Sequence, residues 1–239
     1  PGAAVPPLLT RSITAGQLFE LMHLADSGLP AGGYAFSSGL EGAYHLGLLS
    51  SGAALEEFVQ CALETAARSD IPFIHSVYVP KEMDVEQLAV MLQLYDAMMT
   101  APAMRRASRT HGKNWLRLLV QLHPRARLDD LRRWLADTGL PTHFAVLFGA
   151  TLRSIGFAEG PGSQLFLFQI LRDQMSAAVR LGVIGPLEAA RRQQGLHEYC
   201  ARILDEVDGI EYTGATRTAP QLDIAQSLHD HLYSRLFQS

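Results

Sequence analysis

The sequence predicts an all-α protein, a single globular helical domain of roughly nine or ten helices. Apolar residues recur three and four positions apart along almost the whole chain, which is the spacing of one helix face. Strict alternation of apolar and polar residues is missing, and no Asn-Gly or Asp-Gly hairpin turn occurs. With 239 residues, 48% of them hydrophobic and 18% charged, the chain can bury a sizeable core. We expect residues 13–239 to form this domain, after a flexible lead-in at residues 1–12.

The helices of the first half follow from their apolar stripes and their start signals. Thr14 is placed to cap a helix that runs to about Asp26. Asp84 is placed to cap a later one, with acidic and amide side chains in its first turn. Helical spacing therefore predicts helices over residues 14–26, from about residue 40, and over residues 55–66, 85–99 and 115–122.

The second half continues in the same way, with predicted helices over residues 128–135, 144–152, 164–181, 187–207 and 222–237. Residues 165–171 have almost no polar face, so their helix should lie at the centre of the domain or under a partner. The central position is favoured because burial is the common fate of such runs. Turn signals separate the helices at Ser51-Gly52, Ile71-Pro72, His123-Pro124, residues 138–141, residues 160–162, Gly185-Pro186 and Gly209.

Residues 26–39 form a loop of small residues that is rich in Gly and also carries a Pro and two aromatic residues. Such a backbone can bend sharply and approach another molecule closely. The GxxxxGK[ST] and GxGxxG patterns are both absent, which argues against a nucleotide cradle. Ser37 and Ser38 do not fit a G-x-S-x-G elbow, so neither is expected to be a nucleophile. An all-α enzyme or small-anion-binding protein that closes loop 26–39 over its ligand stays open as an alternative.

No fixed metal site and no cofactor motif is visible. His229 and His231 could share an ion only in an extended tail, because positions two apart on a helix point about 200° from each other. The other histidines stand singly and are best read as surface or hydrogen-bonded helix residues. A transient nickel contact stays open, because imidazole suits Ni(II). A chain of this size without a nucleophile or a cofactor motif favours a binding or scaffold protein over an enzyme.

Charge and cysteine content bound the remaining classes. The net charge of −4 gives no drive toward nucleic acid or an anionic membrane. Basic residues concentrate in the segment 105–133, where a solvated helix face is favoured and a docking surface for an acidic partner is the intermediate option. No apolar run approaches the roughly 20 residues of a membrane span. With Cys61 and Cys200 isolated and no leader-like start, we expect a soluble, cytoplasmic protein.

Four segments resemble the motifs of the UreF family of urease accessory proteins. Residues 24–41 are similar to its D-S/P-x-L-P-x-G-G/A-F/Y-x-x-S-x-G-L-E pattern. Residues 143–149 resemble its H-Y/F-x-x-x-F/Y-G helix, and residues 176–182 its S-A-A-V-R-L-G segment. The close of the chain, residues 220–237, is similar to its P-x-L-D-I…S-R-L-F tail. The four matches stand in family order and span nearly the whole sequence.

The resemblance implies an all-helical fold and a non-catalytic role. UreF-type proteins bridge a UreD/UreH-type accessory protein and a dimer of the GTPase UreG, and the assembly delivers nickel to apo-urease. UreF is itself usually a homodimer. We therefore expect these partners and a homodimer, with no binding of nucleic acid or membrane.

The resemblance also implies where partners bind. The loop around Gly32–Tyr34 would touch the GTPase, and the C-terminal segment, about residues 210–239, would dock the UreD/UreH-type protein. Arg180 and Arg235 are expected as polar anchors, although an intramolecular tie between helices is an open alternative for Arg180. Aromatic side chains are expected as buried anchors. The complete set of expected partner-binding residues is Pro30, Gly32, Gly33, Tyr34, Phe36, Ser38, Glu41, Arg180, Tyr233, Arg235 and Phe237.

Overall fold

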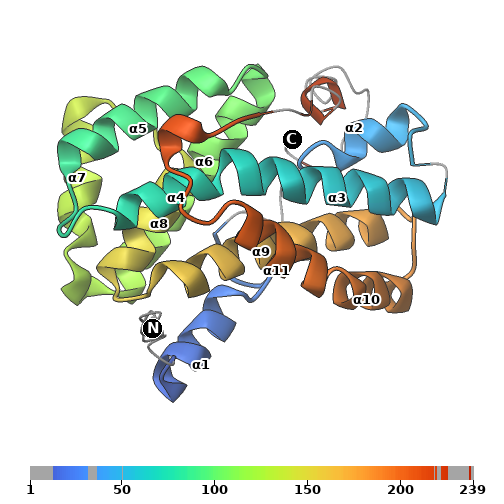
Figure 1. The fold of residues 1–239 in the computed structure, drawn as a ribbon, viewed down its shortest axis with the longest axis horizontal. Helices are drawn as coiled ribbons and strands as arrows, with labels where there is room; N and C mark the ends of the chain where they lie inside the picture. Colours follow the sequence, from blue (N-terminus) through green and yellow to red (C-terminus); the bar gives the residue numbers. More distant parts are fainter. Residues whose placement is uncertain are drawn as a thin grey trace, which may run out of the picture.

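The computed structural model describes residues 13–31, 37–49, 51–217, 219, 222–225 and 237. All regular structure in these ranges is helical, which confirms the all-α class (Figure 1). The expected lead-in at residues 1–12 lies outside the described residues. The α-helices are α1 (Ala15–Leu24), α2 (Leu40–His45), α3 (Gly52–Ser69), α4 (Ile71–Tyr78), α5 (Val85–Met98), α6 (Pro102–Leu122), α7 (Leu128–Thr138), α8 (Phe144–Ser154), α9 (Glu159–Arg180), α10 (Pro186–Gly195) and α11 (His197–Glu206).

Helix α9 is the central element. It runs through the middle of the molecule and contacts α2, α3, α4, α8, α10 and α11 (Figure 1). Leu167 and Leu171 on it are fully buried. Its apolar run therefore lies in the domain core, which confirms the favoured position for residues 165–171.

Aromatic rings from α6, α8 and α9 form the densest part of the core. The Trp115 ring stacks on Phe148 with centroids 5.1 Å apart, and Phe148 meets Phe166 edge to face at 5.2 Å. Gly112 lets α6 approach the start of α8, because a Cβ at this position would lie 2.1 Å from the Thr142 carbonyl oxygen. The crossing of α6 and α8 thus depends on a missing side chain.

Helix α4 was not predicted, α6 begins at Pro102 rather than near residue 115, and two further boundaries differ from the prediction. A turn was expected at Ile71-Pro72, but only Asp70 separates α3 from α4. Pro72 is tolerated there because the first turn of a helix needs no N–H from it. One helix was expected over residues 187–207, but the chain divides at Leu196 into α10 and α11. Sequence spacing missed the division at Leu196 because the apolar stripe continues across it.

Helix α1 projects from the body of the molecule (Figure 1). Its N-terminus carries the predicted cap, in which the Thr14 side chain accepts a hydrogen bond from the Gln17 amide at 3.2 Å. Leu24 anchors the other end in the core. Phe19 and Met22 are 73% and 61% exposed, so α1 presents an apolar face to its surroundings.

Candidate functional site

The described residues of the loop 26–39 lie at its two ends. On the first side, the Asp26 side chain accepts a hydrogen bond from the Gly28 amide at 2.8 Å, which turns the chain away from α1. Pro30 follows and is exposed, as expected of a residue offered to a partner. On the second side, Ser38 has a φ of 49° and Gly39 a φ of 91°, so the chain re-enters α2 through two left-handed residues.

Three polar side chains of α9 hold both ends of this loop. Gln169 Nε2 donates to the Leu24 carbonyl at 2.8 Å, and Arg172 donates to the Ala25 carbonyl. On the far side of the loop, Gln174 Nε2 donates to the Ser37 carbonyl at 3.3 Å. Both loop ends are therefore fixed to one helix.

Sequence reasoning did not single out these anchors. In a long helix, polar residues look like its ordinary solvated face. The available signal was Gln169, an amide in the middle of the apolar run 165–171. This residue is 8% exposed, and a buried amide needs a hydrogen-bond partner. Here that partner is the backbone at the start of the loop.

Glu41, at the start of α2, is 1% exposed. Its backbone amide donates to Ser37 Oγ at 3.4 Å. Ser38, three residues earlier, is exposed. Of these two expected partner contacts, Ser38 is accessible on the surface. Glu41 is buried, so a partner could reach it only if α2 moved. The partner roles of both residues stay predictions.

Arg180 and Phe237, two expected partner anchors, lie against each other. The Arg180 guanidinium carbon sits 3.9 Å from the centre of the Phe237 ring, a cation–π contact between the end of α9 and the C-terminal tail. Phe237 is 6% exposed. The structure thus brings the two residues together inside one chain, in line with the intramolecular alternative for Arg180.

The described part of the tail packs on α3, α5 and α6. The Thr216 amide donates to the Arg68 carbonyl of α3 at 2.9 Å. Arg217 forms an ion pair with Asp223 at 2.7 Å and also contacts the Met104 sulfur of α6 at 2.7 Å. Leu222 is buried in a small cluster with Ala62. The tail between residues 215 and 225 is therefore integrated into the fold.

The remaining expected site residues lie outside the described ranges. They are Gly32, Gly33, Tyr34, Phe36, Tyr233 and Arg235, together with the two candidate nickel contacts His229 and His231. Their roles stay predictions.

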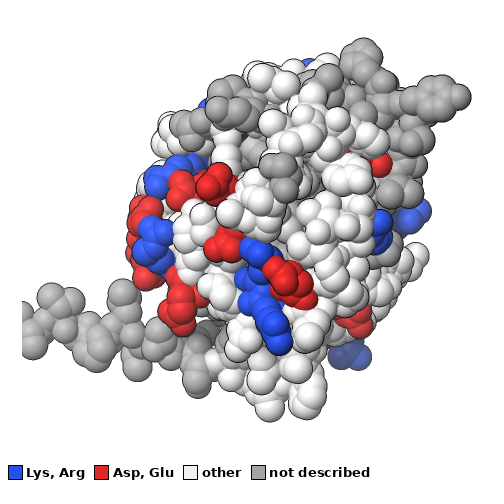
Figure 2. Space-filling model, turned by 90° about the vertical axis from the view of Figure 1, so that its right-hand side faces the viewer, with Lys and Arg blue, Asp and Glu red and all other residues white. Residues whose placement is uncertain are grey.

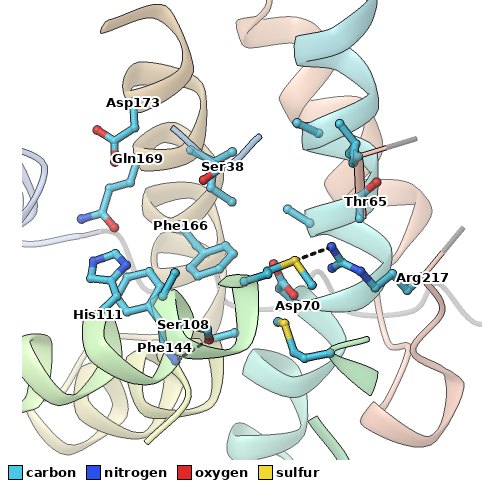
Figure 3. Close-up of a pocket in the computed structure, with 18 of the residues that line it drawn as sticks. Ser38, Thr65, Asp70, Ser108, His111, Phe144, Phe166, Gln169, Asp173 and Arg217 are labelled. Carbon is cyan, nitrogen blue, oxygen red and sulfur yellow. Dashed lines mark hydrogen bonds between the residues drawn. The ribbon is translucent and has the colours of Figure 1, made fainter. Parts of the chain in front are cut away.

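A cavity of about 180 Å³ opens behind the loop base. Its walls come from α3, α6, α8, α9 and the tail, and Ser38 lies at its rim (Figure 3). Asp70, Asp173 and Arg217 are charged residues in its lining. Burial raises the pKa values of the Asp70 and Asp173 carboxyls. Such a lining does not favour an anion, which weakens the small-anion alternative.

Ser108, His143 and Asp96 form a chain of contacts that has the composition of a hydrolase triad. His143 Nδ1 lies 3.1 Å from Ser108 Oγ, and its Nε2 lies 2.7 Å from Asp96 Oδ1. The imidazole has no exposed surface, and Ser108 Oγ accepts the backbone amide of Phe144 at 3.3 Å. The trio ties α5, α6 and the start of α8 together, so His143 is the hydrogen-bonded helix histidine that was expected.

In the basic segment 105–133, ion pairs hold Arg109, Arg127, Arg132 and Arg133. Arg109 bonds Asp96 of α5, an acidic residue outside the segment. Within α7, Arg132 and Arg133 bond Asp129 at 2.7 and 3.1 Å. Exposed pairs of this kind contribute little stability but cancel the local field. The solvated helix face is the reading that these contacts support.

The face that carries α2 and α10 has mixed charge. Figure 2 shows Lys or Arg beside Asp or Glu along one side, next to a broad uncharged area. Arg192 of α10 pairs with Glu56 of α3 at 2.9 Å. Exposed apolar side chains on these elements and the turn after α2 include Leu48 and Leu187, which are 52% and 67% exposed.

The described ranges contain neither a membrane-spanning helix nor a cluster of metal-ligating side chains. None of the helices there is long and apolar enough to cross a bilayer. No group of three or more His, Cys, Asp or Glu side chains in these ranges is arranged to hold a metal ion.

Comparison with known proteins gives consistent matches. A model of the family described as UreF matches residues 49–197. Urease accessory protein F of Oryza sativa subsp. indica is 32% identical over 233 residues, covering 97% of this chain and 88% of that protein. Urease accessory protein UreF of Cupriavidus metallidurans is 25% identical, covering 93% and 98%. A bifunctional urease accessory protein UreEF of Bordetella bronchiseptica is 26% identical, covering 99% of this chain and 55% of that protein.

The family match and the sequence motifs agree in position. The segments 143–149 and 176–182 fall inside the matched span, on α8 and at the end of α9. The plant relative extends the similarity over nearly the whole chain, far beyond the matched span. All of these relatives carry the name of urease accessory proteins. The chain belongs to the UreF family.

Proposed function

We propose that this protein is a non-catalytic scaffold of urease maturation in the cytoplasm. It bridges a UreD/UreH-type accessory protein and a UreG-type GTPase, and the assembly enables nickel insertion into apo-urease. Nickel is the cargo of this assembly. The GTP chemistry belongs to the partner, in keeping with the absence of phosphate-binding motifs from this sequence. The existence of a bifunctional UreEF relative supports action together with other accessory proteins.

The observation that carries the proposal is the role of α9 as a common anchor. Gln169, Arg172 and Gln174 hold the ends of the loop 26–39. Gln174, six residues before the end of α9, contacts the loop at Ser37, and the last residue of the helix, Arg180, contacts the tail at Phe237. A bridging protein needs two docking segments in a fixed relation. One rigid helix that touches both segments provides this relation.

The GTPase contact is tested by Tyr34→Ala. We expect this change to abolish copurification of the GTPase, because aromatic anchors dominate interface energetics. The matched control is Val90→Ala, a truncation of an exposed apolar residue on α5. Both variants should keep the wild-type melting temperature. Unchanged yield of the complex with Tyr34→Ala would refute the loop assignment.

The second contact is tested by Arg235→Ala and Phe237→Ala. Truncation after Ala219 is a poorer test, because it also removes Leu222 and Ala225, which are buried against the body of the protein. We expect both point variants to lose the UreD/UreH-type partner while a Tyr34→Ala variant keeps it. Retention of that partner by both tail variants would exclude the tail as its docking site.

Self-association belongs to the same proposal, and the exposed face of α1 supports it. Leu18, Phe19 and Met22 are 53%, 73% and 61% exposed, and Glu20 between them is paired with His123 at 3.0 Å. Phe19→Glu should shift the protein toward monomer in light scattering, because a charge desolvated in an apolar interface is costly. A dimer of unchanged stability in this variant would move the interface away from α1.

The decisive test of the whole role is urease activity in a strain that lacks this chain. We expect inactive urease at low nickel and partial recovery in excess nickel. Full urease activity at low nickel without the chain would overturn the maturation role.

A further inference from the structure

The cavity behind the loop base is a separate feature from the two docking segments. Figure 3 shows Phe166 at its middle, with Asp173, Gln169 and His111 on one side and Thr65, Asp70 and Arg217 on the other. The volume of about 180 Å³ greatly exceeds the space that one water molecule needs, about 10–15 Å³ on the same measure. It is large enough for a long side chain or a small organic molecule.

The lining carries two carboxylates, each bonded through one oxygen. Asp70 Oδ1 accepts from the Tyr95 hydroxyl at 2.7 Å and from Ser69 Oγ at 2.8 Å. Asp173 Oδ1 accepts both hydrogen bonds from the Arg172 guanidinium, at 2.9 and 2.7 Å. The Oδ2 atoms take part in none of these bonds. Each carboxylate therefore has acceptor capacity left for an N–H donor.

The cationic side chain of the lining, Arg217, is already committed. It donates to Asp223 Oδ1 through two nitrogens, at 3.0 and 2.7 Å. Burial keeps the pKa of His111 far below its usual value, near about 3, so this ring adds no positive charge. Because Asp173 is paired with Arg172 and Arg217 with Asp223, Asp70 is the carboxyl of the lining without an ion pair among the described residues.

The third acceptor of the lining is the side-chain oxygen of Gln174. Gln174 lies in the lining and is 2% exposed, and its Oε1 atom has no hydrogen-bond partner among the described residues. Its amide nitrogen is fixed on the Ser37 carbonyl, so the orientation of the amide is set. A buried acceptor left unbonded costs about 1–3 kcal/mol. A ligand with N–H donors would remove this cost.

The rest of the lining is apolar. Ile170 and Phe166 stand one and two turns before Gln174 on the same face of α9, and Met99 and Met104 line the cavity from other elements. Such walls suit methylene groups, and an aromatic face attracts a cation. The cavity thus combines hydrogen-bond acceptors and carboxyl groups with apolar walls.

We propose that this cavity binds an organic cation, an ammonium or guanidinium group carried on an alkyl stem. The N–H donors bond Gln174 Oε1 and a carboxylate oxygen, and the stem lies along Phe166 and Ile170. The same chemistry is found in a free small amine and in a Lys or Arg side chain of a partner. The inference does not depend on the bridging role.

The test is calorimetric titration of the full chain at neutral pH. The probes are n-butylammonium, n-butylguanidinium and n-butanol, which shares the stem but lacks the charge. We expect saturable one-to-one binding of a cationic probe and none of the alcohol. Equal binding of n-butanol, or no saturable binding of either cation, would overturn the proposal, the latter because the cavity then holds water only.

Two variants locate the binding. Ala107→Leu places three extra carbons in the lining from α6 without removing a polar group, and should abolish binding of the cations. Asp173→Asn should weaken binding about tenfold, which corresponds to about 1.4 kcal/mol. Ala136→Leu on α7, where the alanine is exposed, is the matched control and should bind like the wild type. Undiminished binding to Ala107→Leu would place the site elsewhere and refute the assignment.

A metal ion is the rival occupant. Titration with Ni²⁺ in the same variants separates the two, because a metal site would lose Ni²⁺ affinity in Ala107→Leu while failing to bind n-butylammonium, and this pattern overturns the proposal. Once cation binding is shown, its source follows from protein purified from its own cells. An amine released on denaturation identifies a free ligand as the source.

Discussion

At the residue scale, buried polar groups determine where single substitutions act. Trp115 is completely buried, and its Nε1–H donates to Thr151 Oγ1 at 2.8 Å. Thr151→Val keeps the shape of the side chain but leaves the indole N–H without this acceptor. We expect a loss of about 1–3 kcal/mol in the free energy of unfolding, measured by urea denaturation.

The control for this change is Thr151→Ser, which keeps the hydroxyl and removes one methyl group, worth about 0.8 kcal/mol. The hydroxyl also donates to the Phe148 carbonyl at 3.0 Å, and serine preserves that bond. A valine variant as stable as the serine variant would show that the indole hydrogen bond contributes nothing measurable.

A second prediction at this scale concerns acid. Burial, with a contribution from Arg172, lowers the pKa of His111 to about 3 from the usual 6.5 of histidine. Below pH 6.5 the unfolded chain therefore binds a proton that the native state does not, and stability falls as the pH drops. The slope is at most about 1.4 kcal/mol per pH unit for one proton. His111→Gln should flatten this fall.

The measurement is the midpoint of urea denaturation at pH values from about 6.5 down to about 4, the range over which one imidazole would differ between states. Asp70 and Asp173 oppose the effect, because their raised pKa values let the native state bind protons first as the pH falls. Their contribution is common to wild type and variant, so the difference between the two curves reports His111. His45→Gln, at the exposed end of α2, is the control. Parallel curves for wild type and His111→Gln would contradict the prediction.

At the scale of elements, the fold depends on close helix crossings. Gly112→Ala would place a Cβ 2.1 Å from the Thr142 carbonyl oxygen and 2.9 Å from the Phe144 nitrogen, both backbone atoms. Overpacking of this kind costs about 1–3 kcal/mol, more than the 0.5–1 kcal/mol or so that alanine gains in a helix. We expect Gly112→Ala to lower the denaturation midpoint.

Gly160→Ala is the matched control, since no atom lies within 4 Å of a Cβ at this position in the first turn of α9. It should leave stability unchanged or slightly raised. If both alanine variants behave alike, the crossing of α6 and α8 has room to adjust.

At the scale of the whole molecule, the described part of the tail joins α3 and α6 through its contacts with Arg68 and Met104. Arg217 and Asp223 are 13% and 22% exposed and hold the tail against α6. Asp223→Asn should weaken this attachment by about 1–3 kcal/mol, because a charge-assisted hydrogen bond is lost. We expect faster limited proteolysis between residues 215 and 225, identified by mass spectrometry, with little change elsewhere.

Asp208→Asn, in the exposed turn after α11, serves as the control for that experiment. Equal cleavage rates in wild type and Asp223→Asn would mean that apolar packing of Leu222, rather than the ion pair, retains the tail.

The helical class and the central place of α9 could be predicted because both follow from the spacing of apolar residues along the chain. Residues 165–171 lack a polar face, and a helix without a polar face is normally buried in the core. The loop 26–39 stood out for its composition. Its anchoring by Gln169 could not be predicted, because a contact between distant segments leaves no periodic trace. The same holds for the contact between Arg180 and Phe237, although an intramolecular role for Arg180 was one of the two alternatives that the sequence left open.

The contact of Phe237 with Arg180 has a practical consequence for how this protein is handled. An affinity tag fused after Ser239 would start two residues beyond a ring that is packed against the end of α9. Resin capture through such a tag pulls on the same residues that a tail-binding partner would use. Copurification with a C-terminal tag should therefore be compared with an internal tag, and the exposed turn at Gly139, where a Cβ meets nothing within 4 Å, offers an insertion point.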